Sequence, residues 1–151
     1  MLFRCQSACC FLLLLLLNAC SDPAPSIATQ WGTPEAIATE FFDALYNTDD
    51  FEKVKYFSTK KYAALLDSYG TTRQVSRILI NISFDNVDIS INPSSQNVRQ
   101  QYEEEADISV VLIGHYENER IAEVRLVTLV QHGGRWLVNS VKEDKLSRSA
   151  H

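Results

Sequence analysis

The sequence predicts an α+β fold, in which N-terminal helices pack on an antiparallel β-sheet of about four strands. Apolar residues recur at helical spacing between residues 33 and 69, whereas β-branched runs and alternating apolar residues follow from residue 84 onward. Helices followed by a series of strands is the typical order of an α+β domain. The chain has 151 residues, of which 46% are hydrophobic and 22% charged, which fits one globular domain better than two.

The first helix is predicted to begin at Thr33-Pro34-Glu35. Thr33 is suited to the N-cap and Pro34 to the first helical position, and Glu35 lies where the helix dipole favours a negative charge. The helix then presents one apolar stripe, formed by Ile37, Phe41, Phe42 and Leu45.

Two further helices are predicted before residue 70. Residues 47–50 end the first helix and cap the second, and Ser58 or Thr59 begins the third. Gly70 can close the third helix in a left-handed turn. The segment of residues 71–80 fits either a short helix or a strand.

The remaining segments predict an antiparallel meander. Turns are indicated at residues 117–119 and at Gly133-Gly134, and residues 97–105 are expected to form a loop or the exposed start of a strand. In the last strand, Trp136 and Val138 are expected to be buried. The four strands are expected at residues 84–91, 106–116, 120–131 and 135–142.

Residues 1–19 have the layout of a secretory signal peptide. Arg4 gives a positive start, a run of six leucines ends at Leu17, and the small residue Ala19 follows. The apolar run is too short to span a bilayer comfortably, because a transmembrane helix needs about 20 apolar residues. We therefore exclude this segment from the fold.

The segment Leu17-Asn18-Ala19-Cys20 resembles the bacterial lipobox. The resemblance implies that Cys20 is diacylated on its sulfur, becomes the new N-terminus and is then N-acylated. It also implies a lipid-anchored protein of the cell envelope, and Ser21 after the cysteine favours the outer membrane, facing the periplasm. An ordinary cleaved signal or a short membrane helix remain as alternatives.

The mature chain is expected to contain a tether over residues 20–30, a domain over residues 31–146 and a polar tail over residues 147–151. The full chain has 14 basic and 19 acidic residues, and without Arg4 the mature balance is 13 against 19, a net charge of −6. This acidic balance disfavours nucleic acid as a partner. Beyond Cys20 the chain has no thiol to form a disulfide or a zinc thiolate site.

Residues 35–54, together with Gly134-Arg135-Trp136-Leu137-Val138, resemble the NTF2-like superfamily. Its members form a cone of helices on a curved antiparallel sheet, and the small lipoproteins described as DUF4878-like are the nearest match. The resemblance covers residues 33–142. Its motifs are patterns of apolar residues, an acidic turn and a Gly-x-Trp, which define a fold better than a function.

Some members of the superfamily, such as ketosteroid isomerases, use a carboxylate base that faces an oxyanion donor in an apolar cone. Tyr46, Tyr56, Tyr62 and Asp88 are the residues that such chemistry could recruit. The enzyme motif is not reproduced at matching positions, so the resemblance assigns no catalytic residue. Asp88 alternates with Val87 and Ile89, which places it on the solvent face of a strand.

The sequence indicates no cofactor and no metal site. His115 and His132 lie at unequal distances from the turn between them, so they are expected to be apart in register, whereas a metal site needs three or four ligands. The acidic run Glu103-Glu104-Glu105 lacks the spacing of a calcium loop and is interpreted as charge that protects a strand start.

Four aromatic residues could line an apolar ligand cavity between helices and sheet, or could fill the core; we favour packing, since a domain of this size needs most of its large apolar residues inside. These residues are Phe41, Tyr62, Tyr69 and Trp136. The expected function is that of a non-enzymatic envelope lipoprotein that binds a small apolar ligand or an envelope protein partner. The alternatives are an isomerase- or hydrolase-like enzyme in the cone, and a structural protein that acts as a homodimer through its exposed sheet face.

Overall fold

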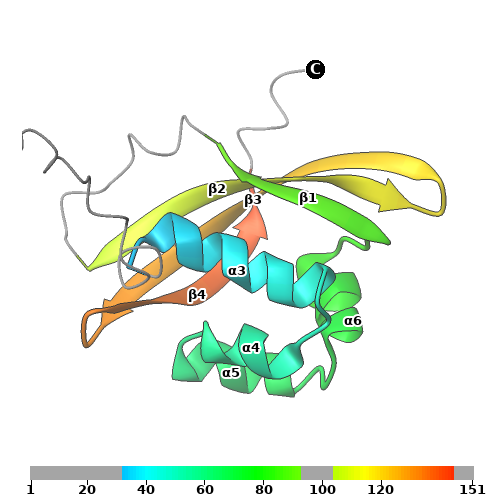
Figure 1. Ribbon diagram of the computed structural model, residues 1–151. Coiled ribbons are helices and arrows are strands. Elements are labelled where there is room, and N and C mark those ends of the chain that lie inside the picture. Colours follow the sequence, from blue (N-terminus) through cyan, green and yellow to red (C-terminus); the bar gives the residue numbers. More distant parts are fainter. Residues whose placement is uncertain (1–31, 93–103, 145–151) are drawn as a thin grey trace, which may run out of the picture.

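The computed structural model describes residues 32–92 and 104–144. Helices precede a four-stranded antiparallel sheet in the chain, which confirms the α+β class. The helices within the described residues all lie on one face of the sheet (Figure 1). The predicted signal peptide, Cys20, the tether over residues 20–30 and the tail over residues 147–151 lie outside the described residues.

Helix α3, Pro34–Tyr46, begins as its sequence predicts. The Thr33 side chain accepts a hydrogen bond of 3.2 Å from the backbone N–H of Ala36, and Pro34 occupies the first turn. The predicted stripe is the buried side of the helix, since Ile37, Phe41, Phe42 and Leu45 are all buried. The cap and the stripe together fix where this helix starts and which side faces the sheet.

The next two helices are short and also carry side-chain caps. Asp50 caps α4, Phe51–Tyr56, by accepting from the N–H of Lys53, and Thr59 caps α5, Lys60–Asp67. Thr59 rather than Ser58 is therefore the start of the third helix. Gly70 follows it with a φ of +78°, the left-handed turn that the sequence predicts.

The ambiguous segment after Gly70 is helical. It forms the single turn α6, Thr72–Gln74, which continues into the π-helix η2, Val75–Ile80. Asn81 ends η2 in the left-handed conformation, with a φ of +59°, which asparagine tolerates better than most residues. Residues 82–85 then connect η2 to the sheet.

The sheet has the strand order β1-β2-β3-β4. The predicted strands are confirmed, with boundaries shifted by one or two residues; β1, for example, begins after Phe84. The two tight turns contain only Glu117-Asn118 and Gly133-Gly134, and all four residues have positive φ, as in type I′ hairpins. The strands are β1, Asn86–Ile91, β2, Glu105–Tyr116, β3, Glu119–His132, and β4, Arg135–Glu143.

A short segment covers the β4 edge of the sheet. The N–H of Thr59 donates to the carbonyl of Val138 at 2.9 Å, and the N–H of Val138 donates to the carbonyl of Phe57 at 2.8 Å. The β3–β4 register shifts between Thr128 and Leu129, which leaves Asn139 as the extra residue of a bulge. The bulge lies next to Val138, where the covering segment is attached.

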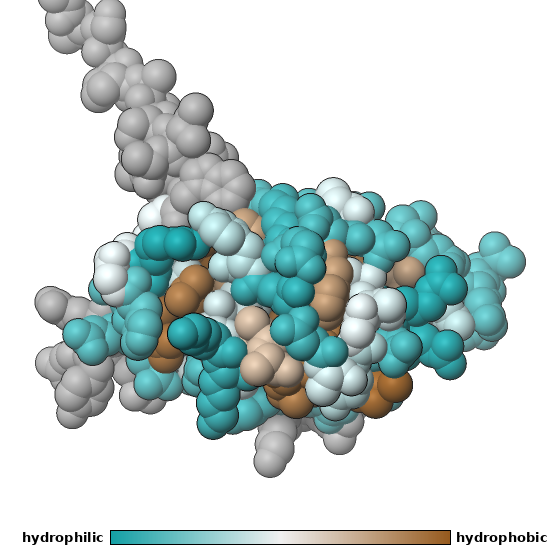
Figure 2. All heavy atoms as spheres, turned by 90° about the horizontal axis from the view of Figure 1, so that it is seen from below, coloured by the Kyte–Doolittle hydropathy of each residue, from teal (hydrophilic) through white to brown (hydrophobic). Residues whose placement is uncertain are grey.

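The space between α3 and the sheet is filled. Helix α3 contacts all four strands, and α4 and α5 pack beneath it (Figure 1). Seen from this helical side, the surface is largely hydrophilic with scattered apolar side chains (Figure 2). The largest fully buried side chains, which form one core, include Phe41, Phe42, Phe57, Leu66, Ile108, Leu112 and Leu129.

Candidate functional site

The structure distributes the four aromatic residues of the sequence prediction between core and surface. Phe41 is fully buried and Tyr62 is 5% exposed, and their ring centroids lie 6.2 Å apart inside the core. Tyr69 and Trp136 are partly buried and pack against that core. The four side chains therefore do not surround one common cavity, and Trp136 alone among them lines a pocket described below.

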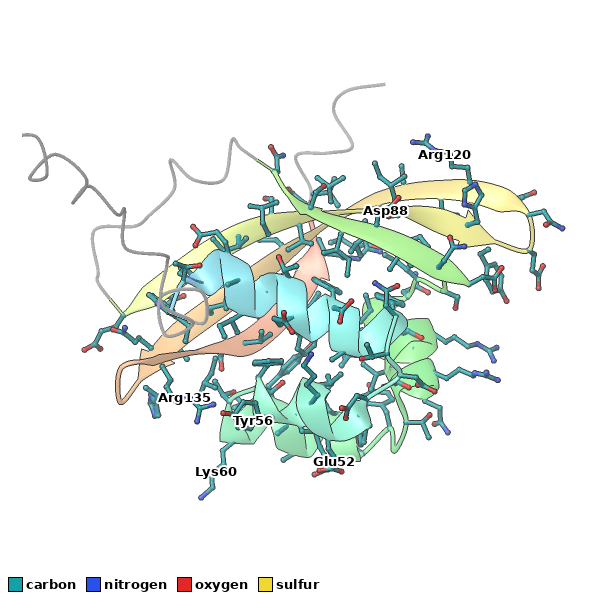
Figure 3. The ribbon with its side chains drawn as sticks, in the orientation of Figure 1. Glu52, Tyr56, Lys60, Asp88, Arg120 and Arg135 are labelled. Atoms are coloured by element: carbon teal, nitrogen blue, oxygen red, sulfur yellow. The ribbon has the colours of Figure 1, made fainter. Side chains whose placement is uncertain are left out.

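The Trp136 pocket has a volume of about 270 Å³ and lies at the β4 side of the fold. The guanidinium of Arg135 is stacked 4.6 Å above the ring of Tyr56, a cation–π arrangement that forms part of the rim. Figure 3 shows Arg135 and Tyr56 close together at this end of the molecule. The lining residues are Gly32, Ile37, Tyr56, Phe57, Gly134, Arg135 and Trp136.

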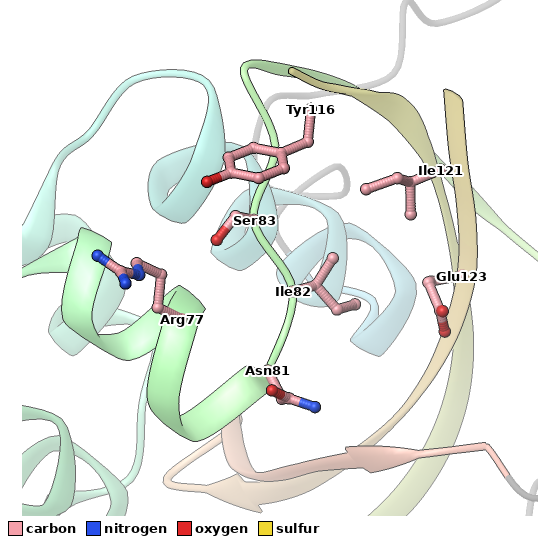
Figure 4. Close-up of a pocket in the computed structure, with 7 residues that line it drawn as sticks. All are labelled: Arg77, Asn81, Ile82, Ser83, Tyr116, Ile121 and Glu123. Atoms are coloured by element: carbon pink, nitrogen blue, oxygen red, sulfur yellow. The ribbon is translucent and has the colours of Figure 1, made fainter. Parts of the chain in front are cut away.

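A second pocket of about 290 Å³, which we call the connection pocket, lies where the chain passes from η2 to β1. One wall is formed by η2 and the connection, and the other by the ends of β2 and β3 (Figure 4). Isoleucine side chains from both walls face it together with polar and charged groups. The lining residues are Arg77, Asn81, Ile82, Ser83, Tyr116, Ile121 and Glu123.

Hydrogen bonds hold the connection wall in place. The N–H of Ile82 donates to the carbonyl of Ser76 at 3.0 Å, and the Tyr46 hydroxyl donates to the carbonyl of Ile82 at 3.2 Å. Burial raises the pKa of Tyr46 well above its usual value, while the positive charge of Arg125 lowers it in part. Tyr46 is therefore a neutral donor that ties α3 to the wall of the pocket.

A buried arginine lies behind the pocket. Arg125 is 4% exposed, on the face of β3 that packs against the helices. Its Nη1 donates to Glu123 Oε2 and to the Val124 carbonyl, each at 3.0 Å, and its Nη2 donates to the Ile80 carbonyl at 3.4 Å. Its Nε has no hydrogen-bond partner in the part of the chain that the structure describes. Arg125 thus joins the end of η2 to the carboxylate of Glu123.

The connection pocket contains two opposite charges that do not pair with each other. Within residues 32–92 and 104–144, Arg77 makes no ion pair, and Glu123 pairs with Arg125 through Oε2. The Glu123 side chain is 45% exposed, so its carboxylate reaches both the pocket and the solvent. A carboxylate can accept about four hydrogen bonds, so Glu123 retains the capacity to bind a ligand.

The hydroxyl of Tyr62 is a different kind of buried polar group. It is enclosed in the core and has no hydrogen-bond partner of normal geometry among the described residues. Burial raises its pKa, and the nearby backbone of Val141 lowers it in part. Tyr62 lines neither the Trp136 pocket nor the connection pocket, so its hydroxyl is not part of either candidate site.

The histidines and the acidic residues considered from the sequence lie apart. His115 is opposite Arg120 in the β2–β3 pair, whereas His132 is opposite Arg135 in the β3–β4 pair. Asp88 is exposed on β1, and Tyr56 is 61% exposed. No group of three or more potential metal ligands occurs within the described ranges. Of the run at residues 103–105, residue 103 lies outside those ranges and Glu105 begins β2.

The residues of the connection pocket were not among the candidates predicted from the sequence. Arg77 lies in the segment of residues 71–80, whose secondary structure was ambiguous, and Asn81 directly follows it. Glu123 is more than 40 residues away along the chain. The strand pattern does contain a signal for Arg125, because it alternates in phase with the buried Val127 and Leu129. A charged residue in such a position is expected to be buried and paired.

Comparison with known proteins supports the fold alone. No family model matches the chain, and no curated protein matches it in sequence. The chain is similar to the solution structure of a SEC-C motif containing protein from Rhodopseudomonas palustris, with a TM-score of 0.56. The two are 11% identical, and the match covers 78% of this chain and 84% of that one, so it shows the fold alone. None of the described helices is long and apolar enough to cross a membrane.

Proposed function

We propose that this chain is a non-enzymatic lipoprotein of the bacterial cell envelope, anchored through Cys20, that binds a small ligand in the connection pocket of an NTF2-like domain. The observation that carries the binding role is the pocket itself, whose lining combines isoleucine side chains with polar and charged groups. The pocket volume of about 290 Å³ lies at the lower end of the range for small-molecule sites.

The anchor rests on the lipobox-like segment at residues 17–20. Several acyl chains hold a small domain on a membrane, since each buried methylene contributes about 0.8 kcal/mol. Ser21 supports placement at the outer membrane, facing the periplasm. In fractionated cells, we expect the wild-type chain in the membrane and the Cys20→Ala chain outside it; a Cys20→Ala chain that remains membrane-bound would overturn the anchor.

The NTF2-like assignment rests on the resemblance of residues 35–54 and 134–138, to which the observed element order adds support. N-terminal helices packed on an antiparallel sheet of about four strands are the arrangement that the resemblance implies. An experimental structure of the chain tests the assignment, because a different strand order would contradict it.

Binding is preferred to catalysis because of where the carboxylates lie. An isomerase-like base needs a desolvated carboxyl group in an apolar cavity. The interior between α3 and the sheet is filled by apolar side chains, and Glu123 is at the rim, 45% exposed and already paired with Arg125. A carboxylate in this setting is suited to holding a ligand rather than to abstracting a proton.

The binding role is tested with the chain as it is produced in the cell. Mass spectrometry of the purified protein is expected to find a bound small molecule in the wild type and to lose it in Ser83→Trp, which places a large ring in the pocket. Ser68→Trp, at an exposed helix end, is the control. A small molecule that persists in Ser83→Trp would place the binding site elsewhere.

A structural role as a homodimer is the second candidate, because the outer face of the sheet carries partly exposed apolar residues. Their strand positions point away from the helices and form neighbouring pairs, such as Val111 beside Val124. Analytical ultracentrifugation tests this candidate, and a monomer at all concentrations would contradict it. The residues concerned are Val111, Ile113, Val124 and Leu126.

A further inference from the structure

We propose that the Trp136 pocket is a second binding site, specific for a compact carboxylic acid whose apolar body packs on Phe57 and Trp136 and whose carboxylate pairs with Arg135. The Trp136 pocket and the connection pocket share no lining residue, so this inference goes beyond the proposed function. It rests on one combination of features, an apolar and aromatic wall with a positive charge at its rim.

Most of the wall of the Trp136 pocket is apolar. Ile37 and Phe57 are buried members of the core, and Trp136 is partly buried and packs against it. These side chains come from three separate elements, which are α3, the C-cap of α4 and β4. None of the described residues that line the pocket is acidic. Such a wall favours a ligand with an apolar body, because binding removes that body from water.

Arg135 supplies the charge at the rim. Its guanidinium carbon lies 4.6 Å from the centre of the Tyr56 ring, which also lines the pocket. Within residues 32–92 and 104–144, Arg135 makes no ion pair. The ring contacts one face of the guanidinium, and the N–H groups at its edge remain available as donors. A carboxylate can accept two parallel hydrogen bonds from them, which a neutral amide cannot do as strongly.

The position of this charge is fixed by its neighbours. Tyr56 is the last residue of α4, and its ring packs edge-on against Phe57, with ring centroids 5.4 Å apart. Arg135 begins β4 directly after the tight turn Gly133-Gly134. Figure 3 shows Arg135 and Tyr56 together at this end of the molecule. Tyr56 is therefore a positioning residue, because it orders the guanidinium before a ligand binds and reduces the ordering cost of binding.

The size and charge of the pocket limit its ligand. A volume of about 270 Å³ is close to the lower limit of about 300 Å³ for small-molecule sites, which suits one ring or a short alkyl chain better than a peptide. One guanidinium without a carboxylate among the described lining residues is complementary to a single negative charge. A compact carboxylic acid meets both conditions.

The test is an NMR titration of the purified, unmutated chain with three probes: phenylpropanoate, its amide and acetate. The amide lacks the charge, and acetate lacks the apolar body. We expect phenylpropanoate to shift the backbone amide signals of residues 134–136 and to bind about tenfold more tightly than either of the other probes. Equal binding of the acid and its amide, shifts confined to other parts of the chain, or no shift at millimolar concentration would overturn the proposal.

A pair of variants assigns the charge to its residue. In Arg135→Gln, phenylpropanoate and its amide are expected to bind equally. Lys60→Gln removes a positive charge at the same end of the molecule, from a side chain that extends away from Arg135 (Figure 3), and is expected to keep the preference for the acid. An Arg135→Gln chain that keeps this preference would contradict the assignment.

The positioning role of Tyr56 is tested through its ring. Tyr56→Phe keeps a ring beside the guanidinium and is expected to keep the wild-type affinity for phenylpropanoate. Tyr56→Leu removes the ring and is expected to weaken binding of the acid by about two- to fivefold, and to weaken binding of the amide less. Because Tyr56 is 61% exposed, the fold is expected to tolerate both substitutions. Equal losses in the two variants would contradict this role.

Failure of this inference is distinguishable from failure of the proposed function. Ser83→Trp blocks the connection pocket only, so it is expected to bind phenylpropanoate as the wild type does. If Ser83→Trp abolishes this binding, the acid occupies the connection pocket, and the second site is wrong while the binding function stands. If the acid binds as expected and Ser83→Trp retains its co-purified molecule, the second site stands and the proposed function is wrong.

Discussion

The Nη1 atom of Arg125 lies 3.0 Å from Oε2 of Glu123. This ion pair joins a buried side chain to a half-exposed one, since the Arg125 side chain is 5% exposed and the Glu123 side chain is 45% exposed. A buried guanidinium needs partners, because transfer of a charge out of water costs several kcal/mol. Two backbone carbonyls, those of Val124 and Ile80, supply part of this compensation. The carboxylate supplies the opposite charge and at the same time forms part of the connection pocket.

We expect Glu123→Ala to destabilise the folded chain by about 1–3 kcal/mol, because it leaves Arg125 buried without its carboxylate. In an Arg125→Met background, the same substitution is expected to cost less than about 0.5 kcal/mol, since the buried charge is no longer present. Urea unfolding of the four chains measures this coupling. Equal costs in both backgrounds would show that the two side chains are independent.

Tyr46 and Tyr62 are expected to respond differently to removal of their hydroxyl groups at neutral pH. Tyr46→Phe loses the hydrogen bond to the Ile82 carbonyl and is expected to cost about 0.5–1.5 kcal/mol. Tyr62→Phe removes a buried hydroxyl that has no hydrogen-bond partner of normal geometry among the described residues, and is expected to be neutral or stabilising. Urea unfolding at pH 7 distinguishes the two; a larger cost for Tyr62→Phe would contradict this assignment.

The same tyrosines predict a loss of stability at alkaline pH. Burial raises the pKa of both hydroxyls above their unfolded value of about 10, so above that pH the unfolded chain releases protons that the folded chain retains. The free energy of unfolding therefore falls as the pH rises, by up to about 1.4 kcal/mol per pH unit for each tyrosine.

The double variant Tyr46→Phe/Tyr62→Phe isolates this effect. Its free energy of unfolding is expected to fall less steeply than that of the wild type between about pH 9.5 and about pH 11, an interval that includes the unfolded pKa of tyrosine. Lys53 contributes in the same direction in both chains, because its hydrogen bond to Glu40 raises its pKa. The difference between the two slopes is thus the tyrosine contribution, and parallel slopes would contradict it.

At Gly114 the backbones of β1 and β2 approach each other closely. A Cβ atom added there would collide with the carbonyl oxygen of Asn86 and would lie 2.7 Å from Cδ1 of Phe84. Because one of these neighbours is backbone, Gly114→Ala is expected to displace β1 and to cost about 1–3 kcal/mol. His115→Ala, one residue further along and exposed, is the control with an expected change below about 0.5 kcal/mol. Thermal unfolding of both variants checks this, and equal transition temperatures would contradict it.

Substitution of Phe41 is expected to destabilise the fold more than substitution of Trp136, because Phe41 lies in the core and Trp136 lines a pocket. Phe41→Ala creates a cavity at a fully buried position and is expected to cost about 3–5 kcal/mol. Trp136→Ala is expected to cost about 1–2 kcal/mol, because this ring is partly buried and lines an open pocket. Urea unfolding compares the two. A cost for Trp136→Ala as large as that for Phe41→Ala would mean that the ring is part of the core.

The helix caps and the tight turns were predicted correctly because interactions between neighbouring residues determine them. Thr33, Asp50 and the glycines at 133–134 act on their own neighbours, so their effects on caps and turns are visible in the sequence. The strands were predicted because β-branched residues dominate them. The segment at residues 71–80 stayed ambiguous because Val75, Leu79 and Ile80 fit either period, and its π-helical geometry has no distinct sequence pattern.

The candidate site was not predictable in the same way, because it depends on contacts between distant segments. Arg77 and Glu123 come to line one pocket only after η2 has packed beside the end of the sheet. The four aromatic residues that the sequence suggested belong to different environments, since aromatic residues supply core packing as readily as pocket walls. The sequence did contain a signal for Arg125, which is a charged residue at a strand position in phase with buried residues.

The two-residue turns at Glu117-Asn118 and Gly133-Gly134 also bear on the order in which the domain folds. They bring β2, β3 and β4 together through contacts that are short in sequence, and closing such loops costs little chain entropy. We expect this three-stranded meander to form early, with native contacts already present in the folding transition state. The η2 helix and the connection that follows it then join through longer-range contacts, so the connection pocket, which they form with the ends of β2 and β3, is complete only at the end of folding.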